Sequence, residues 1–261
     1  ILTEIIQGID RLADNCHMPE FTNHALPHIC SIVKRASEWG ESDGWLEYTT
    51  SQEAGYLLIA LLIHDIGMLS QDSNDIPNDE KFQYMKGLSD MSNWVRRTHV
   101  IRIEKLVKDM LSDYMENEML SDHLDVIIGM AQSHAKWPWD PHFVTARSQI
   151  AKVGLKEERI GAFNAVIAVC DLLDEDSNRC DTLTLIKHHY GTIENKTHWI
   201  RHAITKRVEG VKAHRIIVRF RRLPVDSPYL DMLYRTLRNH YRLVKLYQEK
   251  LEVIHGEIWH L

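Results

Sequence analysis

Apolar residues recur at helical intervals along most of the chain. The first such stretch, residues 2–14, places Ile5, Ile9 and Leu12 three or four positions apart and predicts a short helix. The same spacing predicts further helices over about 26–39, 51–65, 93–115, 121–135, 157–174 and 231–259. Because helices dominate the pattern, we expect a mainly α fold built as a helical bundle.

The pattern of apolar and polar residues changes after residue 180. Residues 214–220, HRIIVRF, are short and β-branched, and they predict a strand that pairs with residues 203–208 across Glu209-Gly210 as a hairpin. We therefore expect a helical domain over 1–180 and a small C-terminal α/β appendage over 181–261, made of the hairpin and a long last helix.

Three polar or irregular stretches separate the predicted helices of the first domain. Residues 70–80 are polar, acidic and interrupted by Pro77, which predicts a surface flap. Residues 137–143 form a second break that is rich in Trp and Pro. Residues 41–48 are polar, contain Gly44 and predict a loop.

Composition narrows the class of protein. The 261 residues are 44% hydrophobic and 26% charged, as in an ordinary globular protein, and the net charge of −6 gives no reason to expect nucleic acid as a partner. No apolar run reaches the roughly 18–20 residues that span a bilayer, so no membrane partner is expected. The four cysteines lack a C-x-x-C pair, which favours reduced thiols and a cytoplasmic location.

Other partners are expected from the two ends of the sequence. The chain begins with Ile, so we expect it to be a piece of a longer polypeptide whose other domains contact it. The Leu-bearing last helix also suits a homo-oligomer, although it carries no clean heptad.

Histidine and aspartate punctuate the predicted helices at similar separations of 36, 34, 35 and 37 residues, so that each group comes from a different helix. The positions are His28, the adjacent His64 and Asp65, His99, His134 and Asp171. His99 continues an apolar stripe with Ile103 and Leu106, so its side chain is predicted to face the core. The other members follow apolar stripes in the same way.

A metal site explains these buried polar groups better than separate hydrogen bonds. One His on an apolar face is more often a hydrogen-bonded core residue, but four with two carboxylates would each cost about 1–3 kcal/mol if left unpaired. Imidazole and carboxylate ligands suit Mn, Fe, Ni, Co, Mg or Zn. Six ligands exceed what one open catalytic ion needs, whereas two divalent ions bridged by Asp65 use all of them.

The ordered motifs FTNHALPHICSIV, HDIG, RRTHVIR, SHAKW and VCDLLDED resemble the HD superfamily of metal-dependent phosphohydrolases, with its H…HD…H…H…D signature, over about residues 20–180. The RRTH and SH motifs, with His198-Trp199, are most similar to the branch found in multidomain bacterial proteins that carry an Hsp90-like ATPase module. Met68 stands where the cyclic-dinucleotide branch has Lys, and no GYP motif follows, which argues against cyclic di-GMP as substrate.

The resemblance implies a role for each ligand position. His28, His64, Asp65 and Asp171 correspond to the first metal site, while His99 and His134 supply the second with bridging Asp65. It also implies a phosphomonoesterase or phosphodiesterase that acts on a nucleotide or nucleotide-like small molecule. The two ions would lower the pKa of a shared water and present it as a bridging hydroxide.

Charge on the phosphoryl oxygens calls for cations near the metals. We expect Arg97 and Lys136 to act with Asp65 in catalysis and to contact phosphate, unless these cations pair with surface carboxylates. The expected substrate-binding residues are His24, Arg97, Arg102, Lys136 and Arg179. His24 suits a phosphate contact or a cap of its own turn equally, and Asp174 is a candidate to orient a ligand histidine.

Two other functions fit the same ligand set. A small branch of HD-like proteins uses it as a diiron oxygenase, which oxygen-dependent turnover with bound iron would reveal. A non-catalytic nucleotide-sensing regulatory domain of a larger protein would instead bind a nucleotide tightly without turnover.

Overall fold

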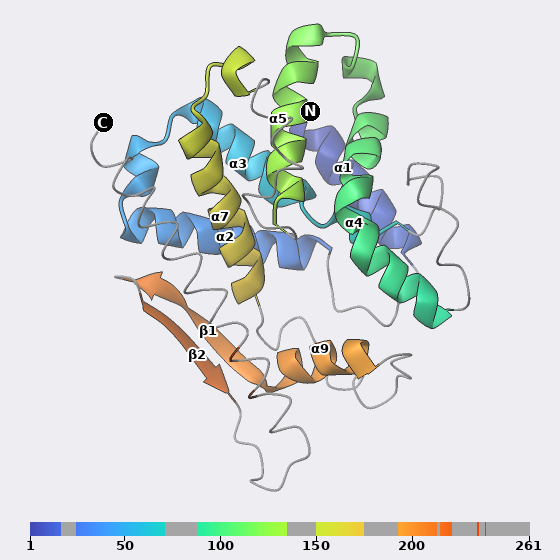
Figure 1. Cartoon of the computed structure of the whole chain (residues 1–261), viewed down its shortest axis with the longest axis vertical. Coiled ribbons are helices and arrows are strands. Elements are labelled where there is room, and N and C mark those ends of the chain that lie inside the picture. Colours follow the sequence, from blue (N-terminus) through green and yellow to red (C-terminus); the bar gives the residue numbers. More distant parts are fainter. Residues whose placement is uncertain are drawn as a thin grey trace, which may run out of the picture.

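The computed structural model describes residues 1–16, 25–70, 88–134, 150–174, 193–212 and 215–220, together with Tyr234 and Arg238. Its mainly α fold is the predicted helical bundle, with a two-stranded hairpin beside it (Figure 1). The helices are α1 (Leu2–Asn15), α2 (Leu26–Ser42), α3 (Ser51–Ile63), α4 (Leu88–Met110), α5 (Glu118–Gln132), α7 (Glu157–Leu173) and α9 (Ile193–Ile204). Short 3-10 turns η1 (Trp45–Tyr48), η2 (Ile66–Met68) and η5 (Ser112–Tyr114) join some of them.

Helix α3 lies at the centre of the bundle because its sequence is apolar on all sides. It contacts α1, α2, α5 and α7, and its buried residues include Leu57, Ala60 and Leu61. A capping box begins the helix: the Thr50 hydroxyl accepts the Glu53 N–H at 3.2 Å, and the Glu53 carboxylate accepts the Thr50 N–H at 2.9 Å. The capping box therefore stabilises the start of the central helix, whose last residues lie in the interior.

The end of α3 differs from the sequence prediction. The helix stops at Ile63, His64 is its C-cap, and Asp65 begins the η2 turn rather than ending the helix. Gly67 lies inside η2, where an added Cβ would sit 1.9 Å from the backbone oxygen of His99. The absence of a side chain at Gly67 therefore allows close contact between η2 and α4.

The segment predicted as a loop over 41–48 is more ordered than expected. Helix α2 continues to Ser42, and Gly44 then adopts φ 74° and leads into η1. Trp45 of η1 is buried between Trp39 and Phe163, with ring centroids 6.4 and 6.5 Å away. The apolar surface of one tryptophan thus holds this polar stretch against α2 and α7.

The hairpin forms with a later turn than predicted. Strands β1 (Thr205–Lys212) and β2 (Arg215–Phe220) pair antiparallel, with Val208 opposite Val218. Glu209 and Gly210, expected in the turn, lie within β1, and the register is irregular between Glu209 and Lys212. Glycine tolerates such a bulge, which explains why its turn signal was misleading.

The hairpin is in contact with the bundle. Strand β1 packs against α2 and α9, and Thr205 at its start is fully buried. The predicted boundary at residue 180 lies outside the described residues and stays a prediction, as do residues 71–80 of the flap and the break at 137–143. Of the helix predicted over 231–259, Tyr234 and Arg238 are described, and both are helical. Among the described helices, none combines the length and apolar character needed to cross a bilayer.

Candidate metal centre

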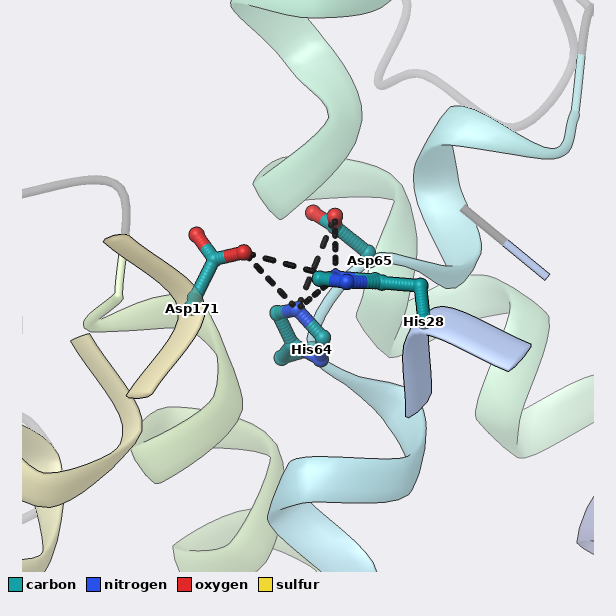
Figure 2. Close-up of side chains that lie close together, drawn as sticks. All are labelled: His28, His64, Asp65 and Asp171. Atoms are coloured by element: carbon teal, nitrogen blue, oxygen red, sulfur yellow. Dashed lines mark hydrogen bonds and ion pairs between the residues drawn. The ribbon is translucent and has the colours of Figure 1, made fainter. Parts of the chain in front are cut away.

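The structure brings together all six residues predicted as metal ligands. Four of them form the first site group, whose potential ligand atoms lie within 4.8 Å of one another (Figure 2): His28, His64, Asp65 and Asp171. The second site group contains Asp65, His99 and His134. The six side chains come from α2, the α3–η2 junction, α4, the end of α5 and α7, so that the fold collects what the sequence separates.

In the first site group, two imidazoles and two carboxylates face a common point. The Nε2 atoms of His28 and His64 lie 3.3 Å apart. Oδ1 of Asp171 is 3.3 Å from Nε2 of His28 and 3.6 Å from Nε2 of His64. Oδ2 of Asp65 is 3.5 Å from both of these nitrogens. Metal–nitrogen bonds of about 2.0–2.1 Å place neighbouring ligand atoms about 3.0–3.4 Å apart, so these separations fit a shared cation.

The second site group uses the other oxygen of the same aspartate. Oδ1 of Asp65 lies 3.2 Å from Nε2 of His134 and 3.6 Å from Nε2 of His99. The two imidazole nitrogens are 3.1 Å apart. Asp65 thus divides its carboxylate between the two groups, which is the arrangement expected of a bridging ligand.

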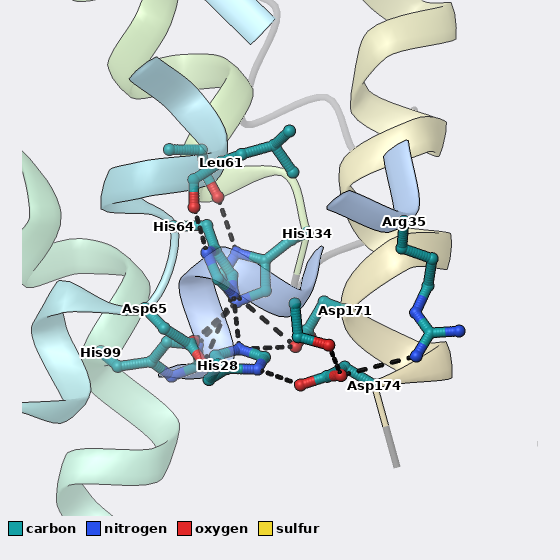
Figure 3. Close-up of polar contacts among 11 residues, drawn as sticks. His28, Arg35, Leu61, His64, Asp65, His99, His134, Asp171 and Asp174 are labelled. Carbon is teal, nitrogen blue, oxygen red and sulfur yellow. Dashed lines mark hydrogen bonds and ion pairs between the residues drawn. The ribbon is translucent and has the colours of Figure 1, made fainter. Parts of the chain in front are cut away.

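Hydrogen bonds at Nδ1 decide which nitrogen of each ring faces inward (Figure 3). The Nδ1 atoms of His64, His99 and His134 donate to the backbone oxygens of the residues three positions earlier, Leu61, Arg96 and Ala131, at 2.9, 2.7 and 2.6 Å. A carbonyl only accepts, so each neutral ring carries its proton on Nδ1 and turns the Nε2 lone pair toward the centre. Facing lone pairs repel one another, and a cation between them removes this repulsion.

Burial and the carboxylates set the charge of the site. Burial lowers the pKa of His99 to about 4, which leaves this imidazole neutral at pH 7. Burial also disfavours the charged form of His134, but the hydrogen bond to Asp65 outweighs this effect and raises the pKa of His134. Burial would raise the pKa of Asp171, yet the adjoining His28 and His64 rings hold it well below 3.8. The carboxylate of Asp171 therefore stays ionised, and the environment of His134 favours a positive charge beside Asp65.

Arg102 is placed differently from the expected phosphate contact. Its side chain is 0% exposed, and Nη1 donates to the backbone oxygens of Gly67 and Ser70. These contacts tie α4 to the η2 segment and do not present the guanidinium to a substrate. Arg97 lies on α4 two positions before His99, and its side chain is not among those described. His24, Lys136 and Arg179 lie outside the described residues.

Two residues of the site were missed in the sequence. Ser31 and Arg35 both contact the carboxylate of Asp174, at 2.5 Å from Ser31 Oγ and 3.6 Å from Arg35 Nη2. The same carboxylate accepts a hydrogen bond from His28 Nδ1 at 2.7 Å, which confirms Asp174 as its orienting partner. The available signal was the spacing of His28, Ser31 and Arg35, which puts all three on one face of α2.

The family model HD-CE matches residues 18–246, which include all six residues of the two site groups. The chain belongs to the HD-CE family. The predicted resemblance to HD-type proteins is thereby confirmed, and the HD-CE match extends beyond the bundle across α9 and the hairpin. No curated protein and no solved structure matches the chain.

Proposed function

We propose that this HD-CE chain is a metal-dependent phosphohydrolase, a phosphomonoesterase or phosphodiesterase acting on a nucleotide or nucleotide-like substrate. The observation that carries the proposal is the division of the Asp65 carboxylate, with Oδ2 facing His28 and His64 and Oδ1 facing His99 and His134. A single ion does not need both sets, whereas two ions bridged by one carboxylate suit displacement at phosphorus.

Each part of the chain contributes a defined task in this proposal. His28, His64 and Asp171 would hold the first cation, His99 and His134 would hold the second, and Asp65 would be a ligand to both. When bound, the two cations supply a water of lowered pKa and neutralise charge that develops on the phosphoryl group. His28, His64, Asp65 and His99 are buried, so that these charges act in a medium of lower polarity than bulk water.

The donor set also limits the kind of metal. Cys170 is adjacent to Asp171, but burial raises the pKa of its thiol to about 12, so it stays protonated at pH 7. The ligands are therefore nitrogen and oxygen, which suits Mn, Fe, Co, Ni, Zn or Mg. Arg97, Lys136, Arg179 and His24 remain our proposed phosphate contacts, to be tested by substitution.

The test is hydrolysis under anaerobic conditions. The purified protein is analysed for metals, stripped with a chelator, reloaded with Mn²⁺ and incubated with a panel of nucleotides. We expect metal-dependent release of phosphate or nucleoside monophosphate, and we expect Asp65→Ala to lose it. Lys105→Gln, which removes an exposed cation paired with Asp109 on α4, is the matched control and should keep full activity.

Two results would contradict hydrolysis and identify another function. Tight nucleotide binding without turnover, with each of Mn, Mg, Co, Ni and Fe, would identify a sensing domain. Turnover that requires both bound iron and oxygen would identify an oxygenase.

A further inference from the structure

We infer that Asp174 is a positioning residue that orients the His28 ring and makes the first site group the stronger of the two cation positions. The inference rests on the proposed function only in requiring that the two site groups bind metal. It concerns a carboxylate that lies outside both groups yet contacts one of their imidazoles (Figure 3).

Asp174 is buried and held from several directions. Its side chain is 1% exposed, and Oδ2 accepts the His28 Nδ1–H at 2.7 Å. Oδ1 accepts the Ser31 hydroxyl at 2.5 Å and lies 3.6 Å from Nη2 of Arg35. These contacts fix both carboxylate oxygens, so the acceptor for His28 has a defined position.

His28 differs from the other three imidazoles in the kind of partner at Nδ1. His64, His99 and His134 donate to neutral carbonyl oxygens of their own helices, whereas His28 donates to a carboxylate on another segment. His28 lies in the first turn of α2, where the Ala25 oxygen already accepts the backbone N–H groups of His28 and Ile29, at 3.0 and 3.3 Å. A charged partner from α7 takes the place of a local carbonyl.

A carboxylate changes the imidazole more than a carbonyl does. Hydrogen bonds to a charged acceptor are roughly twice as strong as neutral ones, and a carboxylate on the second nitrogen makes a ligand histidine more basic. The electron density at Nε2 of His28 is therefore raised on the side that faces the first cation. The second site group contains His99 and His134, whose Nδ1 partners are both carbonyls.

The local fold couples this effect to the first site group. Asp174 is the C-cap of α7, and its N–H donates to the Asp171 oxygen at 3.0 Å. The last turn of α7 therefore supplies both a ligand carboxylate, Asp171, and the carboxylate that orients His28. Any shift of Asp174 acts on two ligands of the first site group and on none of the imidazoles of the second.

The experiment measures metal binding rather than activity. Mn²⁺ is titrated into the metal-free full chain, and free Mn²⁺ is counted by electron paramagnetic resonance. For the wild type we expect two ions bound in two affinity classes. Asp174→Asn should weaken the tighter class about 10- to 100-fold and leave the weaker class within about twofold, since removal of such outer partners typically has this effect.

Glu53→Gln is the matched control because it also removes a buried carboxylate that pairs with an arginine, here Arg159, outside the metal centre. It should leave both affinity classes unchanged. Equal weakening of both classes by Asp174→Asn, or no weakening of either, would overturn the inference. A wild type that binds no Mn²⁺ would overturn the proposed function itself.

A second variant covers the case in which Asp174→Asn does not fold. Arg35→Met keeps Asp174 and all six site-group residues, and removes only the cation 3.6 Å from Oδ1. We expect it to weaken the tighter class alone, by about three- to tenfold, as a milder form of the same loss. Unchanged binding by Arg35→Met, in a fold that matches the wild type by circular dichroism, would overturn the inference.

Discussion

At the scale of single residues, the four imidazoles of the centre present Nε2 because hydrogen bonds at Nδ1 decide their tautomer. Asp65 is the one residue shared by both site groups, whereas His134 belongs only to the second. Substitutions at these two positions therefore have different consequences for the number of bound ions.

His134→Ala should reduce the metal content from two ions per chain to about one and leave the fold intact. Asp65→Ala should lose both ions, because each cation would have one of its oxygens as a ligand. Elemental analysis of the purified variants measures both effects. His123→Ala is the control. His123 lies on α5, the helix that leads to His134, but its ring contacts Tyr56 instead of the metal centre. Two ions retained in His134→Ala would disprove the second site.

The sequence was informative about which residues meet and uninformative about their atoms. Each predicted ligand follows an apolar stripe, and helical periodicity alone directs such a side chain to the core. Which oxygen of Asp65 faces which imidazole depends on how the helices dock, and no spacing encodes it. The burial of Arg102 was missed for the same reason, because a cation beside His99 suggested a phosphate contact and only packing shows that η2 covers it.

At the scale of elements, the contact between η2 and α4 sets the position of Asp65 relative to His99. Gly67 brings the two backbones together, and Arg102, one turn beyond His99 on α4, donates to the carbonyls of Gly67 and Ser70. The absence of a side chain at Gly67 and the buried guanidinium thus act on the same interface.

Gly67→Ala should destabilise the chain by about 2–3 kcal/mol or more, because its Cβ would meet backbone 1.9 Å away and η2 would have to move. Gly55→Ala on α3 is the matched control: its Cβ meets no atom within 4 Å, and it should stabilise the chain by about 0.5–1 kcal/mol. Urea unfolding of both variants gives these values. Equal stability of Gly67→Ala and the wild type would refute the close contact.

At the scale of the whole molecule, Glu53 connects three segments of the bundle. Its carboxylate accepts from Arg159 Nε at 2.7 Å and Nη2 at 2.9 Å, and the same Nη2 donates to the Tyr48 oxygen at 3.0 Å. Burial alone would raise the pKa of Glu53, but the hydrogen bonds from Arg159 and Thr50 lower it below 4.5. The start of α3, η1 and α7 are thus held by a charge that must stay ionised.

The contribution of this pair should depend on pH in one direction. Because the folded pKa is lowered, the pair stabilises the fold above about pH 4.5, and its contribution is lost as the pH falls through the folded value. At pH 7 we expect Glu53→Gln to cost about 2–3 kcal/mol of unfolding free energy, and the difference from wild type should shrink as the pH falls below about 4.5. Urea unfolding across this range measures it.

Glu104→Gln serves as the control, since it breaks an exposed pair with Lys108 and should change stability by less than about 0.5 kcal/mol at any pH. A difference between wild type and Glu53→Gln that grows on acidification would contradict the assignment.

The sequence predicted which segments are helices better than it predicted where the helices and the hairpin turn begin and end. Long amphipathic or apolar stretches such as those of α3 and α7 identify helices because burial requires their pattern. The ends of α4 and the hairpin turn were misplaced by several residues. Helix ends depend on local capping, and strand register depends on pairing across the hairpin, which a bulge near Gly210 alters.

The carbonyl partners of His64, His99 and His134 have a mechanical consequence. Each of these rings is hydrogen-bonded to the backbone three residues earlier, so it keeps its orientation relative to its own helix when that helix slides or tilts. His28 alone is steered by a neighbouring helix. Relative movement of α2 and α7 would therefore rotate the His28 ring away from the first cation position. Movement of α4 or α5 would change only the distance between an imidazole nitrogen and the second cation position.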